Sequence, residues 1–121
     1  METLDVRGVG TLLRGAEHWE CSPIQLNGSI LNIESTAVSL DQEERARWIC
    51  FNWEQLLTLC MNYISLRRGD YGLDAVSFVD PNVFINSGQE WSIYFDTEHA
   101  IDAIVGVDFR GETPFQLTIG D

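Results

Sequence analysis

Residues 41–68 read DQEERARWICFNWEQLLTLCMNYISLRR, and no other stretch of the chain repeats its apolar residues with a helical period over such a length. The polar stripe on the helical wheel of this stretch is narrow, so we expect the helix to be covered on more than one side. Residues 41–68 therefore predict a single long helix at the centre of the fold. One broad apolar face carries Ile49, Trp53, Leu56, Leu57, Cys60, Tyr63 and Ile64, flanked by Trp48, Leu59 and Leu66.

Both ends of this stretch carry residues typical of helix termini. The Asp41 carboxylate can accept a hydrogen bond from the first turn, and Glu44 stands three residues later, as in a capping box. Arg67 and Arg68 place positive charge in the last turn, where the helix dipole favours it. Gly69 can adopt the left-handed conformation that often follows a helix. We therefore predict a helix from Asp41 to Arg68.

Short strands are expected before the helix, in residues 1–40. Apolar and polar residues alternate there in brief runs separated by glycines, and Asn27-Gly28 stands between two of these runs. Asn-Gly accommodates positive φ at both central positions of a two-residue turn. The segment therefore predicts N-terminal strands that include a hairpin turning at Asn27-Gly28.

Residues 73–121 predict an antiparallel meander. Three runs with a period of two follow one another, at residues 91–96, 105–110 and 115–120, as in strands with one buried and one solvated face. Before them, Asp80-Pro81-Asn82 interrupts an apolar run, and proline cannot donate to a strand ladder, so we expect a hairpin turn or a broken edge strand there. The whole chain, residues 1–121, is then one α+β domain, a twisted antiparallel sheet packed on one long central helix.

The charge of the chain restricts its partners. The chain has nineteen acidic residues, seven arginines and no lysine, which gives a net charge of −12. Residues 70–121 hold ten of the acids and one arginine. Such a field repels nucleic acid and anionic lipid and steers a basic protein into contact. With no apolar run long enough for a membrane span and no secretion leader, we expect a cytoplasmic protein whose cysteines are reduced.

Signatures of enzymes and metal sites are missing from the sequence. His18 and His99 stand far apart and belong to no metal-ligand spacing, and no nucleophile elbow or phosphate-binding glycine loop occurs. Acidic pairs such as Asp96 with Glu98 or Asp108 with Glu112 do not match a calcium loop. We therefore expect no catalytic activity, no cofactor and no bound metal.

The solvated face of the meander is the candidate site. Tyrosine among carboxylates is typical of a recognition surface, because the ring supplies an amphipathic anchor and the acids pair with basic residues of a partner. An outer face that is merely solvated remains the alternative. If the alternation holds, one face shares Ser92, Tyr94, Asp96, Asp108, Arg110, Gln116 and Thr118. The residues expected to bind the partner are Tyr94, Asp96, Glu98, Asp102, Asp108 and Glu112.

The last third of the chain also carries a resemblance. Its pattern is WSIYF at residues 91–95, a loop of acids, IVGV at 104–107, then Phe109, Gly111, Pro114 and LTIGD at 117–121. This pattern resembles the tails of small acidic immunity proteins from bacterial toxin-immunity systems, including contact-dependent inhibition. The resemblance rests on strand and turn residues. It implies a cytosolic antidote that covers the active site of a cognate toxin domain, often a basic nuclease.

Two other functions stay open at this point. One is a phage-encoded inhibitor or nucleic-acid mimic, which should space its carboxylates like phosphates along one face to occupy a basic groove on a host defence protein. The other is a small enzyme or ligand-binding module with a cavity between helix and sheet, lined by Trp48, Trp53 and Tyr63. A deep cavity with polar lining would favour that function, whereas large rings ordinarily serve as core.

Overall fold

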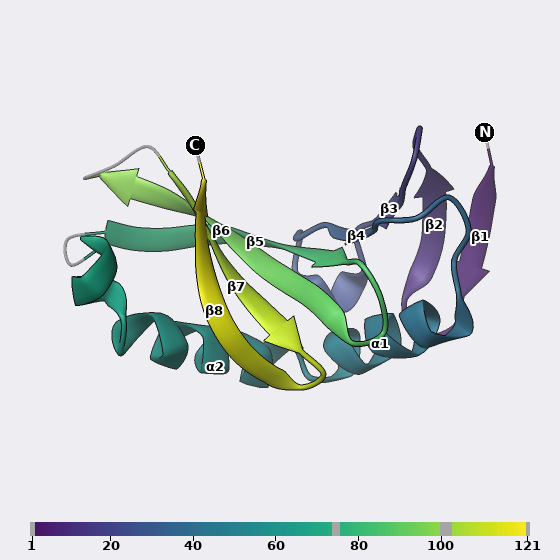
Figure 1. Cartoon of the computed structure of the whole chain (residues 1–121). Coiled ribbons are helices and arrows are strands. Elements are labelled where there is room, and N and C mark those ends of the chain that lie inside the picture. The colour runs from purple at the N-terminus through teal and green to yellow at the C-terminus, as the bar shows by residue number, and fades with distance from the viewer. Residues whose placement is uncertain (1, 74–75, 100–102, 121) are drawn as a thin grey trace.

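The computed structural model describes residues 2–73, 76–99 and 103–120. Within them, eight strands form one sheet whose strand order follows the sequence, and two α-helices lie along one side of it (Figure 1). The strands are β1 Thr3–Val6, β2 Gly10–Arg14, β3 Trp19–Cys21, β4 Leu31–Ile33, β5 Val76–Ile85, β6 Glu90–His99, β7 Ile104–Arg110 and β8 Thr113–Gly120. The helices are α1 Leu40–Phe51 and α2 Trp53–Ser65, with short 3₁₀ helices η1 Ile24–Leu26 and η2 Arg68–Tyr71. The predicted α+β class is confirmed.

The sheet is mostly antiparallel, with one parallel junction in its middle. Strands β1 to β4 pair antiparallel in order, and so do β5 to β8, which form the predicted meander. Between these halves β4 and β5 run parallel, with Leu31 opposite Val83 and Ile33 opposite Ile85. Parallel neighbours need a long crossover connection, which α1 and α2 provide.

The prediction of one long central helix is wrong, because the helix is interrupted at Asn52. This residue leaves the helical conformation, with φ −110° and ψ 19°. Its side-chain Nδ2 donates to the Trp48 carbonyl at 2.8 Å, which also accepts from the Asn52 backbone N–H at 3.0 Å. Asparagine commonly competes with helical hydrogen bonding in this way. Two helices therefore follow each other with a single residue between them.

The helix ends also differ from the prediction. Ser39, not Asp41, caps α1: its Oγ accepts from the Gln42 N–H at 3.1 Å, and its own N–H donates to Gln42 Oε1 at 2.9 Å. This Ser-x-x-Gln pair is a full capping box and explains why the helix begins earlier. At the other end, α2 stops at Ser65, so Arg67 and Arg68 lie beyond its last turn and not within it as predicted. The Arg67 side chain still donates to the Tyr63 carbonyl at 3.2 Å. The left-handed residue is Gly72, after η2, rather than Gly69.

Two predicted turns are corrected as well. Asn27-Gly28 does not close a two-residue hairpin, because Pro23 begins the 3₁₀ turn η1 that buries Leu26 and ends at left-handed Asn27. Asp80-Pro81 forms neither the predicted hairpin turn nor a break in an edge strand. It forms a bulge within β5, where Asp80 has φ 50°, and the parallel pairing with β4 begins only at Val83. A bulge accommodates the proline without ending the strand.

The core lies between the helices and the facing side of the sheet. Trp91 stacks on Phe109 with ring centroids 4.0 Å apart, and Trp48 meets Trp91 edge-on at 6.1 Å. The Trp91 Nε1–H donates to the Gly111 carbonyl at 2.7 Å. Fully buried side chains include Leu12, Leu31, Ile33, Ile49, Leu56, Ile64, Ile85, Trp91, Ile93 and Phe109.

Within the residues that the structure describes, no helix has the length and apolar character needed to cross a membrane.

Candidate functional site

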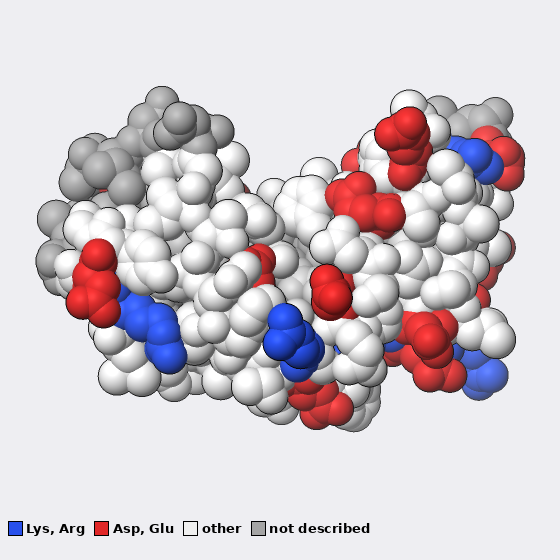
Figure 2. Space-filling view, viewed as in Figure 1, with Lys and Arg blue, Asp and Glu red and all other residues white. Residues whose placement is uncertain are grey.

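The side of the sheet away from the helices carries polar side chains in rows that cross several strands. The helices cover only one side of the sheet, and the molecule is hollowed on the other (Figures 1 and 2). Cross-strand pairing places residues of different strands directly beside one another on this outer face. One row runs Asn32, Phe84, Ser92, Asp108 and Gln116, and the next runs Asn82, Tyr94, Gly106 and Thr118.

The Asp108 carboxylate is held at the centre of these rows. Its Oδ1 accepts from Ser92 Oγ at 2.6 Å. Its Oδ2 accepts from Thr118 Oγ1 at 2.5 Å and from Gln116 Nε2 at 2.8 Å. The three donors come from the strands on both sides of β7, so this acidic group is fixed in orientation by the pairing of β6, β7 and β8.

Tyr94 lies beside Asp108 on a platform made by neighbouring strands. A Cβ atom at Gly106 would stand 2.7 Å from the Tyr94 ring, so the ring rests on the bare backbone of β7. On its other side, Phe84 meets the ring edge-on with centroids 5.5 Å apart. Partial burial and then the charge of Asp108 raise the pKa of the Tyr94 hydroxyl, against the hydrogen bond with Thr118. Tyr94 is therefore a neutral hydroxyl at physiological pH.

Hollows flank Tyr94 on the surface. A cavity of about 410 Å³ has Tyr94 and Ser92 in its wall, and a second, of about 240 Å³, lies between Tyr94 and Asp108. An aromatic ring, a fixed carboxylate and adjacent hollows can receive an extended basic side chain. The larger cavity is lined by Glu34, Phe84, Asn86, Ser92 and Tyr94.

The other predicted partner-binding residues lie elsewhere. Asp96 and Glu98 continue along β6 and line a separate cavity of about 460 Å³ near the β5 bulge. Glu112 lies in the turn between β7 and β8, beside α1. Asp102 lies outside the described residues. Of the six, the structure thus brings together Tyr94 and Asp108.

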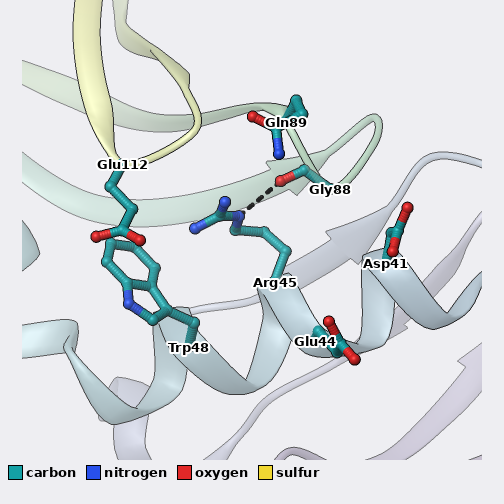
Figure 3. A pocket seen from close by; sticks show the side chains of 7 residues that line it. All are labelled: Asp41, Glu44, Arg45, Trp48, Gly88, Gln89 and Glu112. Atoms are coloured by element: carbon teal, nitrogen blue, oxygen red, sulfur yellow. Dashed lines mark hydrogen bonds between the residues drawn. The ribbon is translucent and has the colours of Figure 1, made fainter.

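Glu112 belongs to a cavity of about 300 Å³ built around Arg45 (Figure 3). The Arg45 Nε–H donates to the Gly88 carbonyl at 2.8 Å, and its guanidinium lies 4.9 Å from the Trp48 ring and 5.9 Å from the Trp91 ring. Burial lowers the pKa of Arg45, and the charge of Glu112 opposes that shift. Arg45 thus ties α1 to the turn between β5 and β6. The cavity is lined by Asp41, Glu44, Arg45, Trp48, Gly88, Gln89 and Glu112.

Three features of these sites were not predicted from the sequence: the roles of Gly106, Phe84 and Arg45. Gly106 interrupts an apolar run, but only the pairing register shows that it lies under Tyr94. Phe84 joins the platform through the same register. The contacts of Arg45 with the Gly88 carbonyl and the Trp48 ring depend on how α1 packs against the turn between β5 and β6. Trp48 is partly buried and lines two cavities beside α1, whereas Trp53 is 3% exposed and belongs to the core.

The three cysteine thiols are partly or fully buried, and burial raises their pKa values. Burial raises the pKa of Cys21 and of Cys60 to about 12 and that of Cys50 to about 11, so these thiols stay protonated at neutral pH. His18 Nε2 lies 3.7 Å from Glu20. Among the described side chains, histidine, cysteine and carboxylate groups do not gather in threes at a spacing that could hold a metal ion.

No protein-family model matches the sequence, and neither a curated protein nor a solved structure matches it.

Proposed function

We propose that this chain is an immunity protein that binds a cognate bacterial toxin domain, such as a basic nuclease, and blocks its active site with the outer face of the sheet. One observation carries the proposal: Tyr94 lies next to the fixed carboxylate of Asp108, on the side of the sheet that the helices leave uncovered.

Tyr94 serves as the anchor of this surface. Tyrosine is enriched among the residues that dominate binding energy, because it buries a large ring and keeps a polar tip. Gly106 and Phe84 hold this ring in place before the partner arrives. A group that is already ordered loses little conformational entropy on binding.

Asp108 supplies the charge that a basic partner needs. A carboxylate offers about four lone-pair positions, and Ser92, Thr118 and Gln116 occupy three of them. The remaining position can accept a charge-assisted hydrogen bond from arginine or lysine. The net charge of −12 attracts such a partner over a longer range and speeds association.

Affinity capture with matched variants tests the proposal. Tagged protein is exposed to bacterial lysates at low and high salt, and retained proteins are identified and quantified by mass spectrometry. We expect one basic protein at a near-stoichiometric ratio, held more weakly at high salt. Tyr94→Ala and Asp108→Asn should lose it. Asp70→Asn, which changes the same charge at the exposed end of η2, should keep it.

The pattern across the variants decides the result. A basic partner retained equally by Tyr94→Ala, Asp108→Asn and Asp70→Asn would move the binding surface elsewhere on the molecule. A partner that is acidic, or that is held more tightly at high salt, would contradict a charge-steered antidote. For a captured nuclease, inhibition of its cleavage by added wild-type protein then tests whether the active site is blocked.

A further inference from the structure

Two aromatic rings and a carboxylate line one cavity on the outer face of the sheet. This cavity has a volume of about 410 Å³, and its wall includes Glu34, Phe84 and Tyr94. Sites for small molecules have volumes of about 300–1,000 Å³, so the cavity is large enough to hold a ligand. No arginine or histidine of the described chain lines it. The wall therefore combines aromatic surface with negative charge.

The two rings stand at nearly a right angle to each other. A Cβ atom at Gly106 would lie 2.7, 2.7 and 2.9 Å from Cε2, Cζ and Cε1 of Tyr94, so one face of this ring covers the β7 backbone. Its other face points away from the sheet. The Phe84 ring is inclined at 79° to the Tyr94 ring, with the centroids 5.5 Å apart. Rings at such an angle can contact one cation together, as in the aromatic cages that bind quaternary ammonium groups.

The carboxylate of Glu34 adds a charge that no basic side chain neutralises. Glu34 directly follows β4, and its backbone N–H donates to the Ile85 carbonyl at 2.9 Å, which fixes its position beside β5. The ion pairs between described residues do not include Glu34. A carboxylate without a counterion, beside two aromatic faces, favours a cation as the ligand.

We propose that this cavity binds a methylated ammonium group, such as the trimethylammonium end of choline. A quaternary ammonium has no N–H, so aromatic faces and a nearby negative charge are enough to hold it. Lysine instead presents three N–H donors and arginine five, and each donor that loses water without finding an acceptor costs binding energy. The ring faces of Phe84 and Tyr94 supply no acceptor positions, which matches the methylated group.

The proposal goes beyond toxin binding and does not rest on it. Tyr94 belongs to both surfaces, but the affinity for a small cation is measured on the free protein, without any protein partner. A cavity that binds no cation would leave the toxin-binding surface intact as a proposal. Failure to capture a toxin would likewise leave the cavity intact.

Three probes distinguish the sources from which a trimethylammonium group could come. Choline represents a free metabolite, phosphocholine a lipid headgroup, and trimethyllysine amide a modified protein. The net charge of −12 should repel the phosphate, so we expect phosphocholine to bind most weakly of the three. The probe that binds most tightly assigns the source.

NMR titration of isotope-labelled protein tests the requirement for a methylated cation. Choline is compared with its neutral isostere, in which a tert-butyl group replaces the trimethylammonium group. We expect choline to bind at least tenfold more tightly and to shift the signals of Phe84 and Tyr94 most. Lysine amide and arginine amide should bind more weakly than trimethyllysine amide. Absence of choline binding, equal binding of the isostere, or tighter binding of an unmethylated amide overturns the proposal.

Matched variants test the rings and the carboxylate. Tyr94→Leu, Phe84→Leu and Glu34→Gln should each weaken choline binding about fivefold or more. Tyr94→Phe keeps the ring and should bind like wild type. Phe51→Leu removes a ring that is 87% exposed outside this cavity, and Asp70→Asn removes a charge at the end of η2, so both should also bind normally. Unchanged binding in Tyr94→Leu and Glu34→Gln, or an equal loss in Phe51→Leu, overturns the site.

Discussion

The Tyr94 ring lies directly across the backbone of Gly106, on the adjacent strand. The absence of a side chain at position 106 is what allows this contact, because a Cβ there would approach the ring to 2.7 Å. The glycine is therefore a spacer for the ring rather than a source of backbone freedom.

Gly106→Ala should displace Tyr94 and break its contact with Phe84. An aromatic pair contributes about 0.5–1.5 kcal/mol, and we expect the free energy of unfolding to fall by about that amount in urea titration. Binding of the captured partner should fall about as much as in Tyr94→Ala. Gly120→Ala serves as the control, since a Cβ at position 120 meets nothing within 4 Å. Equal losses from both variants would show that Gly106 has no special role.

Ser39→Ala should destabilise the protein through the lost cap of α1. Removal of a serine cap costs about 0.5–2 kcal/mol, because an N–H of the first turn loses its acceptor. Asp41→Asn removes only a charge near the helix dipole, worth about 0.3–1 kcal/mol. Thermal and chemical unfolding should rank Ser39→Ala as the more damaging change. The reverse ranking would restore Asp41 as the cap.

Leu56→Ala should be the most damaging of these substitutions to stability. Leu56 is 2% exposed, and truncating a buried leucine costs about 2–5 kcal/mol through lost contacts and a cavity. Leu66→Ala is the matched control, because Leu66 is 82% exposed. Its effect should stay within about 0.5 kcal/mol. Similar unfolding midpoints for the two variants would contradict the packing of α2 against the sheet.

Stability should fall in alkaline solution because of the buried thiols. Burial raises the pKa of Cys60 from 9.0 to about 12, so the unfolded chain releases this proton at a lower pH than the folded one. The contribution to stability is complete below pH 9 and is lost as the pH rises toward 12. Unfolding free energies measured from pH 8 upward should therefore decline less steeply in Cys60→Ala than in wild type. Parallel slopes would show that Cys60 is not protected in this way.

The alternation of residues predicted much of the sheet, because β6 and β7 each bury one face against the helices. Trp91, Ile93 and Phe95 are buried as the pattern requires, and Tyr94 lies on the opposite face. On β8 the same pattern is weaker: Leu117 is buried, whereas Phe115, at a shift in the pairing register with β7, and Ile119, on the edge strand, remain exposed. An edge strand has a neighbour on one side only, which periodicity does not reveal.

The features that the sequence did not predict depend on competition between local and distant contacts. At Asn52 a short polar side chain outcompetes an apolar pattern that continues on both sides of it. At Asn27 a preceding proline starts a 3₁₀ turn before a hairpin can form. The platform under Tyr94 requires the relative register of β5, β6 and β7, and register depends on the whole sheet.

The parallel junction of β4 with β5 also orders the folding of this chain. The other pairs of neighbouring strands are joined by short connections, so those ladders form from nearby segments. The junction instead joins Ile30, whose N–H donates to Asn82 Oδ1 at 2.8 Å, to a residue 52 positions away. Closing so long a loop costs more entropy than closing any hairpin. On the ribosome, β1 to β4 emerge first and must wait for both helices before the strand that completes their sheet is synthesised.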